Sequence, residues 1–378
     1  MSRSPGMDSP PPRRILFAGY APVHFLCFLP VYQRLARDPE LQFWFSGGFR
    51  RKESGAVTYQ IDGFYDPYPI DPAAVIPLDQ ARQEDFDVVV CAHTSDSMFP
   101  RHATRSVQIF HGVSFKNFAV REKVLVYDYL CIPGRYHEER FRNQNLIRQG
   151  GSTFLLTGFP KADNLVGSPL DREEFIRRQH LDPALPTLLY APTGGKKNSL
   201  ETMGREVISA ISRHGRWNLL IKPHDHPKKS IDWFTKLSDL ENDRIRLVHD
   251  RDIMDYLRAA DLLISDASSV AVEYTLLDRP MVFIDVPKLL KNVIKRGGPL
   301  DLDTYGRKIG KVAHTPSEVV AIVQRSLADP DEEQRLRRAM AGHVFFDPGG
   351  AVERVAAVVR HAAGLQPRLP ADIEVLMP

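Results

Sequence analysis

Residues 252–285, DIMDYLRAADLLISDASSVAVEYTLLDRPMVFID, constrain the fold more than any other part of the sequence. A helical pattern leads into the short apolar run 262–264, and a second helical pattern leads into another apolar run, 281–284. This order predicts a β-α-β unit. Such units are typical of an open α/β sheet covered by helices.

A polar turn, Ser265-Asp266-Ala267-Ser268-Ser269, follows the first strand of this unit. Ser268 or Ser269 is suited to cap the next helix, whose free backbone N–H groups and dipole favour a phosphate group. Glu273, one turn inside the helix, is placed to accept hydrogen bonds from a sugar diol. The alternative is a capped helix with a solvated glutamate and no ligand.

The charge balance argues against a nucleic-acid partner. The chain has 378 residues, which suits two domains of roughly 100–200 residues each, and its apolar content of 43% is ordinary for a globular protein. Its 50 basic and 47 acidic residues give a formal charge of only +3, without a polybasic run. We therefore expect no nucleic-acid binding.

Cysteine usage and the opening residues indicate the compartment. Cys27, Cys91 and Cys131 lack C-x-x-C spacing, which predicts free thiols in a reducing environment. The opening MSRSPGMDSPPPRR lacks the apolar core of a signal peptide, so residues 1–13 are predicted to be a disordered tail. We expect a cytoplasmic protein, and peripheral contact with the inner face of the membrane is compatible with the sequence.

Short apolar runs that end in turn residues recur along the whole chain and predict the strands. They cover residues 14–20, 43–45, 86–91, 107–110, 129–132, 154–156, 187–190, 217–221, 246–248, 262–264 and 281–284. The pattern predicts an α/β protein with two doubly wound, Rossmann-like domains whose loops face a shared cleft.

The predicted domains are an N-terminal acceptor-side domain over 14–165 and a C-terminal nucleotide-donor domain over 172–345. A crossing helix and tail are expected over 346–378, with the helix at 351–363 packing back on the first domain. Gly and Pro residues predict a turn at 157–163 and an irregular insertion at 288–305.

Histidines, lysines and hydroxyl residues follow several of these strands. His111 comes directly after the strand 107–110, and Lys222 and His224 come directly after 217–221. In open α/β sheets ligands bind outside the carboxyl ends of strands, so these side chains are candidate site residues. His224 and His226 are two residues apart, but neighbouring lysines oppose a dication, and we predict no metal.

Six short motifs resemble one known family. They are His111-Gly112 with Lys116, Thr157-Gly158-Phe159-Pro160-Lys161-Ala162-Asp163, Tyr190-Ala191-Pro192-Thr193, Lys222-Pro223-His224, Ser265-Asp266-Ala267-Ser268-Ser269, and Phe346-Asp347-Pro348-Gly349-Gly350-Ala351-Val352-Glu353-Arg354-Val355. In this order they are similar to the CDP-glycerol glycerophosphotransferases, the teichoic-acid polymerase family with the two-domain GT-B fold. The resemblance covers roughly residues 105–360.

The resemblance implies transfer of glycerol phosphate, or a similar polyol phosphate, from a CDP-activated donor to an acceptor hydroxyl, with release of CMP. The donor would be CDP-glycerol or a related CDP-polyol, the acceptor a glycan or a lipid-linked hydroxyl, and no cofactor is expected. His111 and His224 match the family's two catalytic histidines. The expected substrate-binding residues are Gly112, Lys116, Thr193, Lys222, Asp266, Ser268, Ser269 and Glu273. The sequence departs from the family at HGVSFK, where the family has H-G-T-P-L-K, and at Glu273, where it usually has aspartate.

As a mechanism we predict that His111 deprotonates the acceptor while Lys222 and His224 stabilise the diphosphate and the departing CMP. Two alternatives stay open. One is a nucleotide-sugar glycosyltransferase or a UDP-sugar 2-epimerase of the same fold, although an E-x₇-E pair is missing because Met281 stands eight residues after Glu273. The other is a domain pair that binds nucleotide without catalysis.

Overall fold

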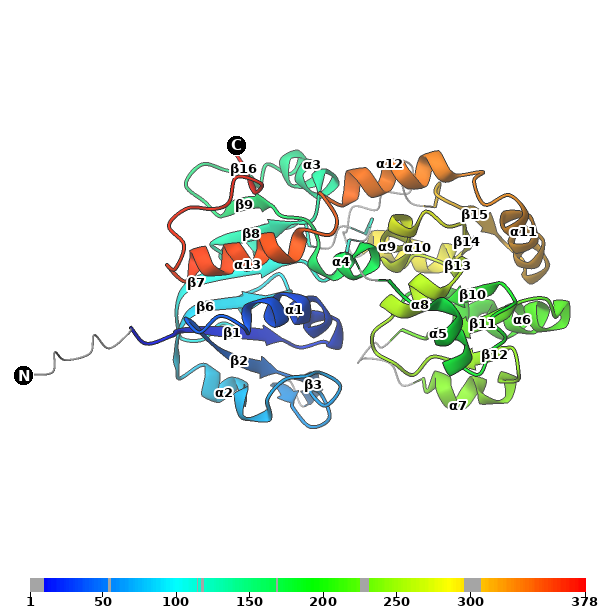
Figure 1. Cartoon of the computed structure of the whole chain (residues 1–378), viewed down its shortest axis with the longest axis horizontal. Coiled ribbons are helices and arrows are strands. Elements are labelled where there is room, and N and C mark those ends of the chain that lie inside the picture. The colour runs from blue at the N-terminus through cyan, green and yellow to red at the C-terminus, as the bar shows by residue number, and fades with distance from the viewer. Residues whose placement is uncertain are drawn as a thin grey trace, which may run out of the picture.

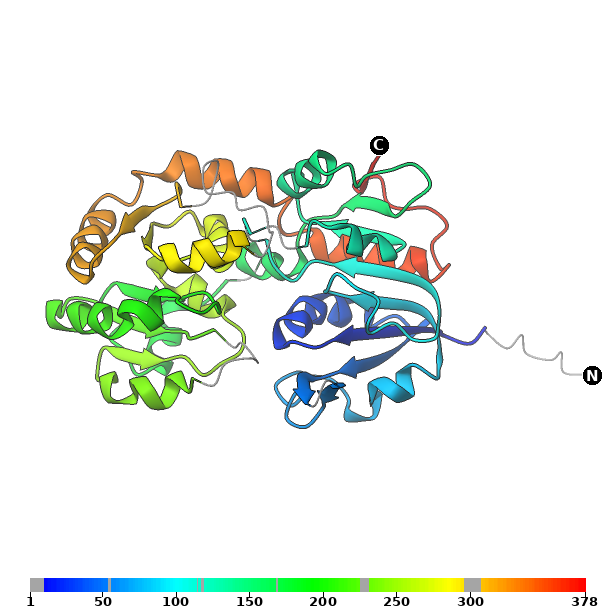
Figure 2. The same cartoon turned by 180° about the vertical axis from the view of Figure 1, so that it is seen from behind.

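The computed structural model describes residues 10–53, 56–113, 115–116, 119–167, 169–224, 231–295 and 307–378. Two lobes lie side by side, each built around one large sheet with helices on both faces (Figures 1 and 2). The fold class predicted from the sequence is confirmed. Most of the predicted tail, residues 1–9, lies outside the described residues, and the first strand begins at Arg13.

The first sheet has eight strands in the order β16-β9-β8-β7-β6-β1-β2-β5. Its strands are β1 (Arg13–Gly19), β2 (Leu41–Gly47), β5 (Val75–Ile76), β6 (Asp85–Cys91), β7 (His102–Ile109), β8 (Tyr129–Ile132), β9 (Thr153–Leu156) and β16 (Glu374–Leu376). All pairs are parallel except β16 with β9. Central β1 is buried on both faces from Ile15 to Ala18, as expected for a parallel strand covered by helices.

The second sheet has six parallel strands in the order β12-β11-β10-β13-β14-β15. Its strands are β10 (Thr187–Tyr190), β11 (Asn218–Ile221), β12 (Ile245–Leu247), β13 (Leu262–Ser265), β14 (Met281–Ile284) and β15 (Lys311–Ala313). The central unit of the sequence is therefore the pair β13 and β14, with β13 next to β10. The chain also forms an antiparallel hairpin, β3 (Phe49–Glu53) and β4 (Ala56–Gln60), beside the first sheet.

Helices connect the strands and cover the sheets. The α-helices are α1 (Pro22–Leu35), α2 (Leu78–Ala81), α3 (Arg135–Asn143), α4 (Pro160–Val166), α5 (Arg172–Arg178), α6 (Ser199–His214), α7 (Trp233–Leu237), α8 (Met254–Ala259), α9 (Val270–Tyr274), α10 (Pro287–Lys295), α11 (Pro316–Ala328), α12 (Gln334–Val344) and α13 (Ala351–Ala362). Short 3₁₀ turns are η1 (Pro72–Ala74), η2 (Glu122–Val126), η3 (Ser238–Leu240) and η4 (Thr275–Leu277).

Two local predictions are wrong. The turn predicted at 157–163 becomes helix α4 from Pro160 onward, because proline at the first helical position lacks only an N–H that would be unpaired anyway. The insertion predicted at 288–305 begins as helix α10, whose Leu289, Leu290 and Val293 are buried on one face. Its remainder, residues 296–305, lies outside the described residues.

The end of the chain returns to the first lobe, as predicted. Helix α13 packs against α1, and β16 extends the first sheet at β9 (Figure 1). Hydrogen bonds between the motifs at 157–163 and 346–355 hold the end of the chain against the first lobe. Asp163 accepts hydrogen bonds from the backbone N–H groups of Gly349 (2.7 Å) and Val352 (2.8 Å). The Arg354 guanidinium, 3% exposed, donates from Nε to the Thr157 carbonyl at 2.7 Å.

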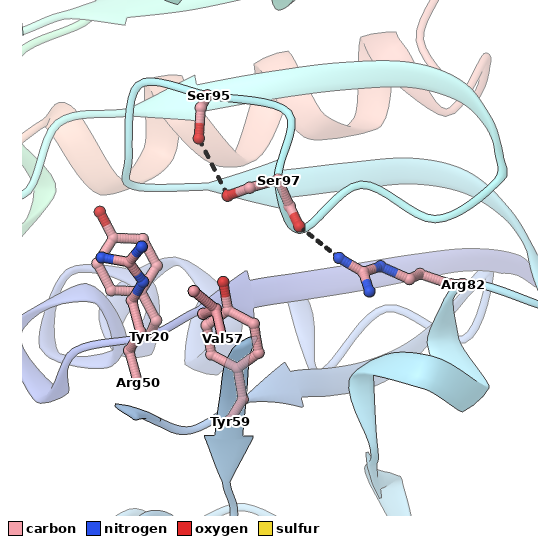
Figure 3. A pocket seen from close by; sticks show the side chains of 7 residues that line it. All are labelled: Tyr20, Arg50, Val57, Tyr59, Arg82, Ser95 and Ser97. Atoms are coloured by element: carbon pink, nitrogen blue, oxygen red, sulfur yellow. Dashed lines mark hydrogen bonds between the residues drawn. The ribbon is translucent and has the colours of Figure 1, made fainter. Parts of the chain in front are cut away.

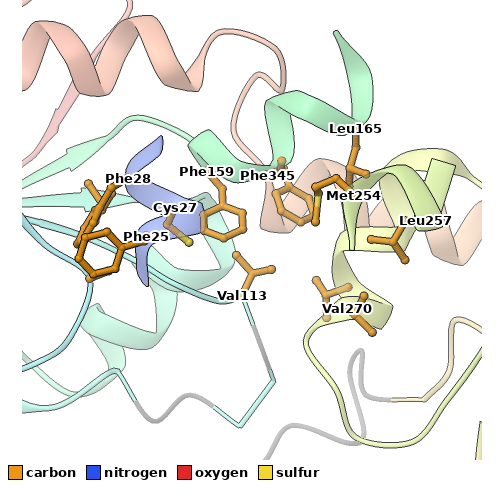
Figure 4. Packing of buried hydrophobic residues seen from close by; sticks show 14 of the residues in the cluster. Phe25, Cys27, Phe28, Val113, Phe159, Leu165, Met254, Leu257, Val270 and Phe345 are labelled. Carbon is orange, nitrogen blue, oxygen red and sulfur yellow. The ribbon is translucent and has the colours of Figure 1, made fainter. Parts of the chain in front are cut away.

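An apolar core passes from one lobe to the other through α4, α8 and α9. Phe25, Cys27 and Phe159 belong to the same buried cluster as Leu257 and Val270 (Figure 4). The two lobes are therefore packed together along one side by apolar contact. None of the helices in the described ranges is long and apolar enough to span a bilayer.

Candidate active site

The candidate residues lie on loops at the carboxyl ends of strands in both sheets. His111, Gly112 and Lys116 follow β7, while Thr193 follows β10. Two contacts join the loops of the two sheets. Lys116 Nζ donates a hydrogen bond to Thr193 Oγ1 at 2.9 Å, and a Cβ placed on Gly112 would lie 3.6 Å from Ser269 Oγ. The structure thus brings the His111 turn against the serine turn after β13.

His111 is held as a neutral ring with one nitrogen unpaired. Its Nδ1 is hydrogen-bonded to the Ala92 carbonyl, and because a carbonyl only accepts, we assign the proton to Nδ1. Nε2 has no hydrogen-bond partner among the described residues, so its lone pair is available. Burial lowers the pKa of His111; the Ala92 carbonyl opposes this shift and the charge of Lys161 adds to it. A neutral imidazole with a free Nε2 can accept a proton.

Two further histidines, His24 and His93, lie close to His111. The His24 ring lies 4.8 Å from the His111 ring and 5.8 Å from the His93 ring, measured between centroids. His93 is 1% exposed, and neither of its ring nitrogens has a hydrogen-bond partner in the described structure. Burial, followed by the nearby His111, lowers the pKa of His93 to about 4. The sequence points to His93 only as a histidine at a strand end, and nothing in it points to His24, which reaches the cluster from α1.

Asp266 holds together the loops at the carboxyl ends of the strands of the second sheet. It is fully buried, and its Oδ1 accepts from the backbone N–H of Thr193 (2.8 Å) and Ala267 (2.6 Å). Its Oδ2 accepts from the backbone N–H and the hydroxyl of Ser199, both at 2.9 Å. Asn198 completes this network by donating to the Thr193 carbonyl at 2.6 Å. Asp266 thus ties the turn after β10 and the start of α6 to the turn after β13.

The serine turn differs from the capped helix start predicted from the sequence. Ser269 already has helical backbone angles, φ −64° and ψ −23°, so its side chain does not reach the next N–H groups and forms no cap. Its Oγ makes no hydrogen bond to any described residue and lies beside Gly112. Ser268 Oγ is buried and accepts a long 3.5 Å bond from the Val270 N–H. Of the two residues predicted to cap the helix, Ser269 forms no cap and Ser268 makes only this long bond, so the Ser269 hydroxyl stays available to a ligand.

Lys222 and His224 follow β11, the strand beside β10. Lys222 is buried, and its Nζ lies 3.4 Å from the Pro223 carbonyl. The exposed His224 ring packs over Gly194, where an added Cβ would lie 2.7 Å from Nδ1. The next residues, 225–230, lie outside the described part of the chain, and with them His226. Within the described ranges, no group of three or more His, Cys, Asp or Glu side chains is placed to hold a metal ion.

Glu273 is 1% exposed and pairs with a lysine from the other lobe. Its Oε2 accepts from Lys161 Nζ at 2.8 Å, while Oε1 accepts no hydrogen bond from a described residue. Burial is the largest single influence and acts to lower the pKa of Lys161, but Glu273, Cys27 and Asp252 together raise it above its ordinary value. The pair joins α4 to α9. This pairing could not be predicted from the sequence, because the partners are 112 positions apart.

The two doubly wound lobes carry histidine, lysine and serine side chains on their facing loops, an arrangement of the GT-B type. The chain belongs to the CDP-glycerol:poly(glycerophosphate) glycerophosphotransferase family, whose profile matches residues 85–361. The resemblance inferred from the six motifs is therefore confirmed, and the protein is an enzyme of this transferase family.

Two curated relatives agree with this family. The teichoic acid glycerol-phosphate primase of Bacillus spizizenii is 28% identical over 173 residues, 43% of this chain and 38% of the relative. The teichoic acid poly(glycerol phosphate) polymerase of Staphylococcus epidermidis is 29% identical over 243 residues, 53% of this chain and 32% of the relative. The chain thus matches only about a third of the length of these relatives.

Among solved structures, the wall teichoic acid polymerase TagF superposes with a TM-score of 0.67 and 17% identity, covering 93% of this chain and 90% of that one. A UDP-N-acetylglucosamine 2-epimerase of Listeria monocytogenes, described as putative, superposes with a TM-score of 0.63 and 14% identity, covering 97% and 100%. At these identities the likeness shows a shared fold alone.

Proposed function

We propose that this enzyme transfers glycerol phosphate from CDP-glycerol, or a similar polyol phosphate from a related CDP-polyol, to an acceptor hydroxyl and releases CMP. The observation that carries the proposal is that Gly112, the residue after His111, lies against the Ser269 hydroxyl of the second sheet. The loop that carries the base therefore meets the hydroxyl groups of Ser269 and Thr193 on the other sheet. Family membership supports the same reaction.

The proposed step conserves atoms and charge. The acceptor oxygen attacks the phosphorus that carries glycerol, and its proton passes to Nε2 of His111. The bond between that phosphorus and the bridging oxygen breaks, and CMP leaves with the bridging oxygen. Negative charge develops on the phosphate oxygens during this step, and positioned donors and cations stabilise it.

The donor is assigned to the second sheet. We assign the hydroxyls of Ser268, Ser269 and Thr193 to the donor phosphates, since these turns are fixed by the Asp266 network. Lys222 and His224, on the neighbouring strand end, are assigned to the diphosphate and the leaving CMP. This arrangement separates the groups that hold the donor from the base that activates the acceptor.

Three residues lie between the groups assigned to the donor and the base assigned to the acceptor. The Gly112 backbone, beside Ser269, and the Lys116 ammonium are assigned to phosphate oxygens near the reacting phosphorus. Glu273 keeps Oε1 for a donor hydroxyl while Oε2 holds Lys161. Asp266 is a positioning residue in this scheme, because all its hydrogen bonds go to the protein.

Ligand choice tests the proposal. We expect calorimetry to show binding of CMP and CDP-glycerol to the wild type, with weaker or no binding of UDP and UDP-N-acetylglucosamine. Ser269→Ala should weaken CDP-glycerol binding roughly threefold to tenfold, the typical value of one neutral hydrogen bond. Preference for the uridine ligands would instead favour a nucleotide-sugar enzyme, and binding of no nucleotide would refute the donor assignment.

A further inference from the structure

A hollow of about 390 Å³ opens in the first lobe, between the hairpin of β3 and β4 and residues that flank β1 and β6 (Figure 3). Its polar lining comes from Tyr20, Arg50, Tyr59, Arg82, Ser95 and Ser97. None of these residues belongs to the donor or catalytic assignments above.

The hollow lies beside the proposed base. Tyr20 directly follows β1, and Ser95 follows β6, the strand next to β7, whose loop carries His111. The His24 ring lies between the hollow and the proposed base. Its centroid is 4.8 Å from that of Tyr20, which lines the hollow, and 4.8 Å from that of His111. The hollow is therefore at the carboxyl-end edge of the first sheet, where ligands of open α/β sheets bind.

The lining is positively charged. Arg50, on the hairpin strand β3, makes no ion pair or hydrogen bond with a described residue, and its guanidinium lies 5.9 Å from the centre of the Tyr20 ring. Arg82 donates to the Ser97 carbonyl at 2.9 Å and pairs with exposed Asp79 at 3.4 Å. No carboxylate is among the lining residues. Guanidinium groups of this kind favour phosphate oxygens, which they bind in a forked geometry.

Hydroxyl groups and aromatic faces complete the lining. Ser95 Oγ and Ser97 Oγ are 3.0 Å apart, and the hydroxyls of Tyr20 and Tyr59 have no hydrogen-bond partner among the described residues. Tyrosine offers an apolar ring face and a polar tip, which suits a ring or chain that carries several hydroxyls. Arginines suited to phosphate oxygens and tyrosines suited to a hydroxyl-rich ring or chain thus line one hollow.

We propose that this hollow is an acceptor subsite that binds a phosphate-bearing sugar or polyol next to the hydroxyl that His111 activates. The proposal rests on the proposed function, since it assigns the acceptor end of that reaction. Phosphate oxygens would meet Arg50 and Arg82, and the sugar or polyol would lie against Tyr20 and Tyr59. The donor is assigned to the other sheet, so both substrates can be bound together.

Titration with a matched series of small probes tests this subsite. Glucose 1-phosphate, glucose and glucuronate share one ring and differ in carrying a phosphate, no charge or a carboxylate. Ligand-observed NMR on the wild-type enzyme should show binding of glucose 1-phosphate, with glucose and glucuronate at least several-fold weaker. Absence of glucose 1-phosphate binding, or equal binding of all three, would overturn the proposal.

Arg50→Gln and Arg51→Gln form a matched pair. Arg51 is the next residue on the same exposed strand, but it does not line the hollow and donates to Gln60 at 3.3 Å. We expect Arg50→Gln to weaken glucose 1-phosphate binding about tenfold or more, the value of a charged hydrogen bond, and Arg51→Gln to change it less than twofold. Equal loss in both variants would mean general surface charge and would overturn the subsite. Tyr59→Phe provides a second lining variant, with a loss of about threefold expected.

Donor binding separates the two proposals. Arg50→Gln should bind CDP-glycerol like the wild type, because the donor is assigned to the second sheet. If the wild type binds CDP-glycerol but Arg50→Gln does not affect glucose 1-phosphate, only the subsite fails. If the wild type does not bind CDP-glycerol, the proposed function fails whatever the sugar phosphate does.

Discussion

The loop edges of the two sheets are built in different ways. At the second sheet the Asp266 carboxylate accepts four hydrogen bonds and fixes three chain segments. At the first sheet the rings of His24, His93 and His111 pack against one another, and both nitrogens of His93 are buried without a hydrogen-bond partner among the described residues. The second edge is therefore organised by a carboxylate and its four hydrogen bonds, and the first mainly by the packing of imidazole rings.

The difference has a consequence for pH. Burial lowers the pKa of His24, His93 and His111, so these histidines stabilise the fold while they are neutral. Acid should therefore disturb the first edge. Substitutions at three residues test this contrast.

Asp266→Ala should cause the largest loss. It leaves the Thr193 N–H and the Ser199 N–H and hydroxyl without their acceptor, at about 1–3 kcal/mol for each buried group. We expect the free energy of unfolding to fall by at least about 3 kcal/mol in urea denaturation and CDP-glycerol binding to be lost. Asp239→Ala, at an exposed carboxylate paired with Arg205, is the control and should change little. Wild-type stability in Asp266→Ala would show that the second edge does not depend on this carboxylate.

His93→Phe should remove part of the acid sensitivity. The folded pKa of His93, about 4, is below the ordinary value of 6.5, so the unfolded chain binds more protons between these values. The stability contributed by neutral His93 is thus present above about pH 6.5 and is lost as pH falls toward 4. Between pH 7 and pH 5 this loss is about 2 kcal/mol.

Urea unfolding at pH 7 and pH 5 measures this effect. The wild type should lose about 2 kcal/mol more than His93→Phe over this interval, and the control His102→Gln, at an exposed histidine, should behave like the wild type. The same pH dependence in the wild type and in His93→Phe would show that the packed histidine rings are not the acid-sensitive element.

Lys116 should give the smallest effect, because it lies between the two edges. Burial lowers its pKa to about 8, and Asp266 opposes the shift. Its ammonium is therefore charged at pH 7 and is lost as pH rises through about 8. We expect wild-type affinity for CDP-glycerol to fall across this range, while Lys116→Met binds about tenfold more weakly at pH 7, about 1.4 kcal/mol, without this pH dependence. Calorimetry at pH 7 and pH 9 measures the CDP-glycerol affinity of the wild type and of Lys116→Met. The same change of affinity with pH in both proteins would exclude Lys116 from the donor site.

The strands could be predicted because buried parallel strands are short apolar runs between turns. Thr187–Tyr190 and Met281–Ile284 match the prediction residue for residue. The hairpin of β3 and β4 was not predicted, since its strands carry exposed arginines and polar residues instead of an apolar run. Helix α10 was not predicted, because the glycines and proline that follow it favoured an irregular segment over the helix that its apolar face indicates.

The site was predictable in position but not in detail. His111 could be predicted as a site residue because it directly follows a strand, and ligands bind at the carboxyl ends of strands in an open sheet. The sequence could not show that His24 on α1 reaches His111, or that Lys161 pairs with Glu273, since both contacts depend on how distant segments pack. Nor did it show that Asp266 points into the protein. The assignments of the individual site residues stay predictions that the substitutions above test.

His111→Asn gives the most direct test of the proposed reaction. Asparagine keeps a side-chain donor for the Ala92 carbonyl but cannot act as a base near neutral pH. CDP-glycerol affinity and CMP release in the presence of a phosphate-bearing polyol acceptor should be measured for this variant and the wild type. The proposal predicts affinity within about twofold of the wild type and CMP release slower by about 10²–10⁴-fold. Unchanged CMP release in the variant would contradict the assignment of His111 as the base.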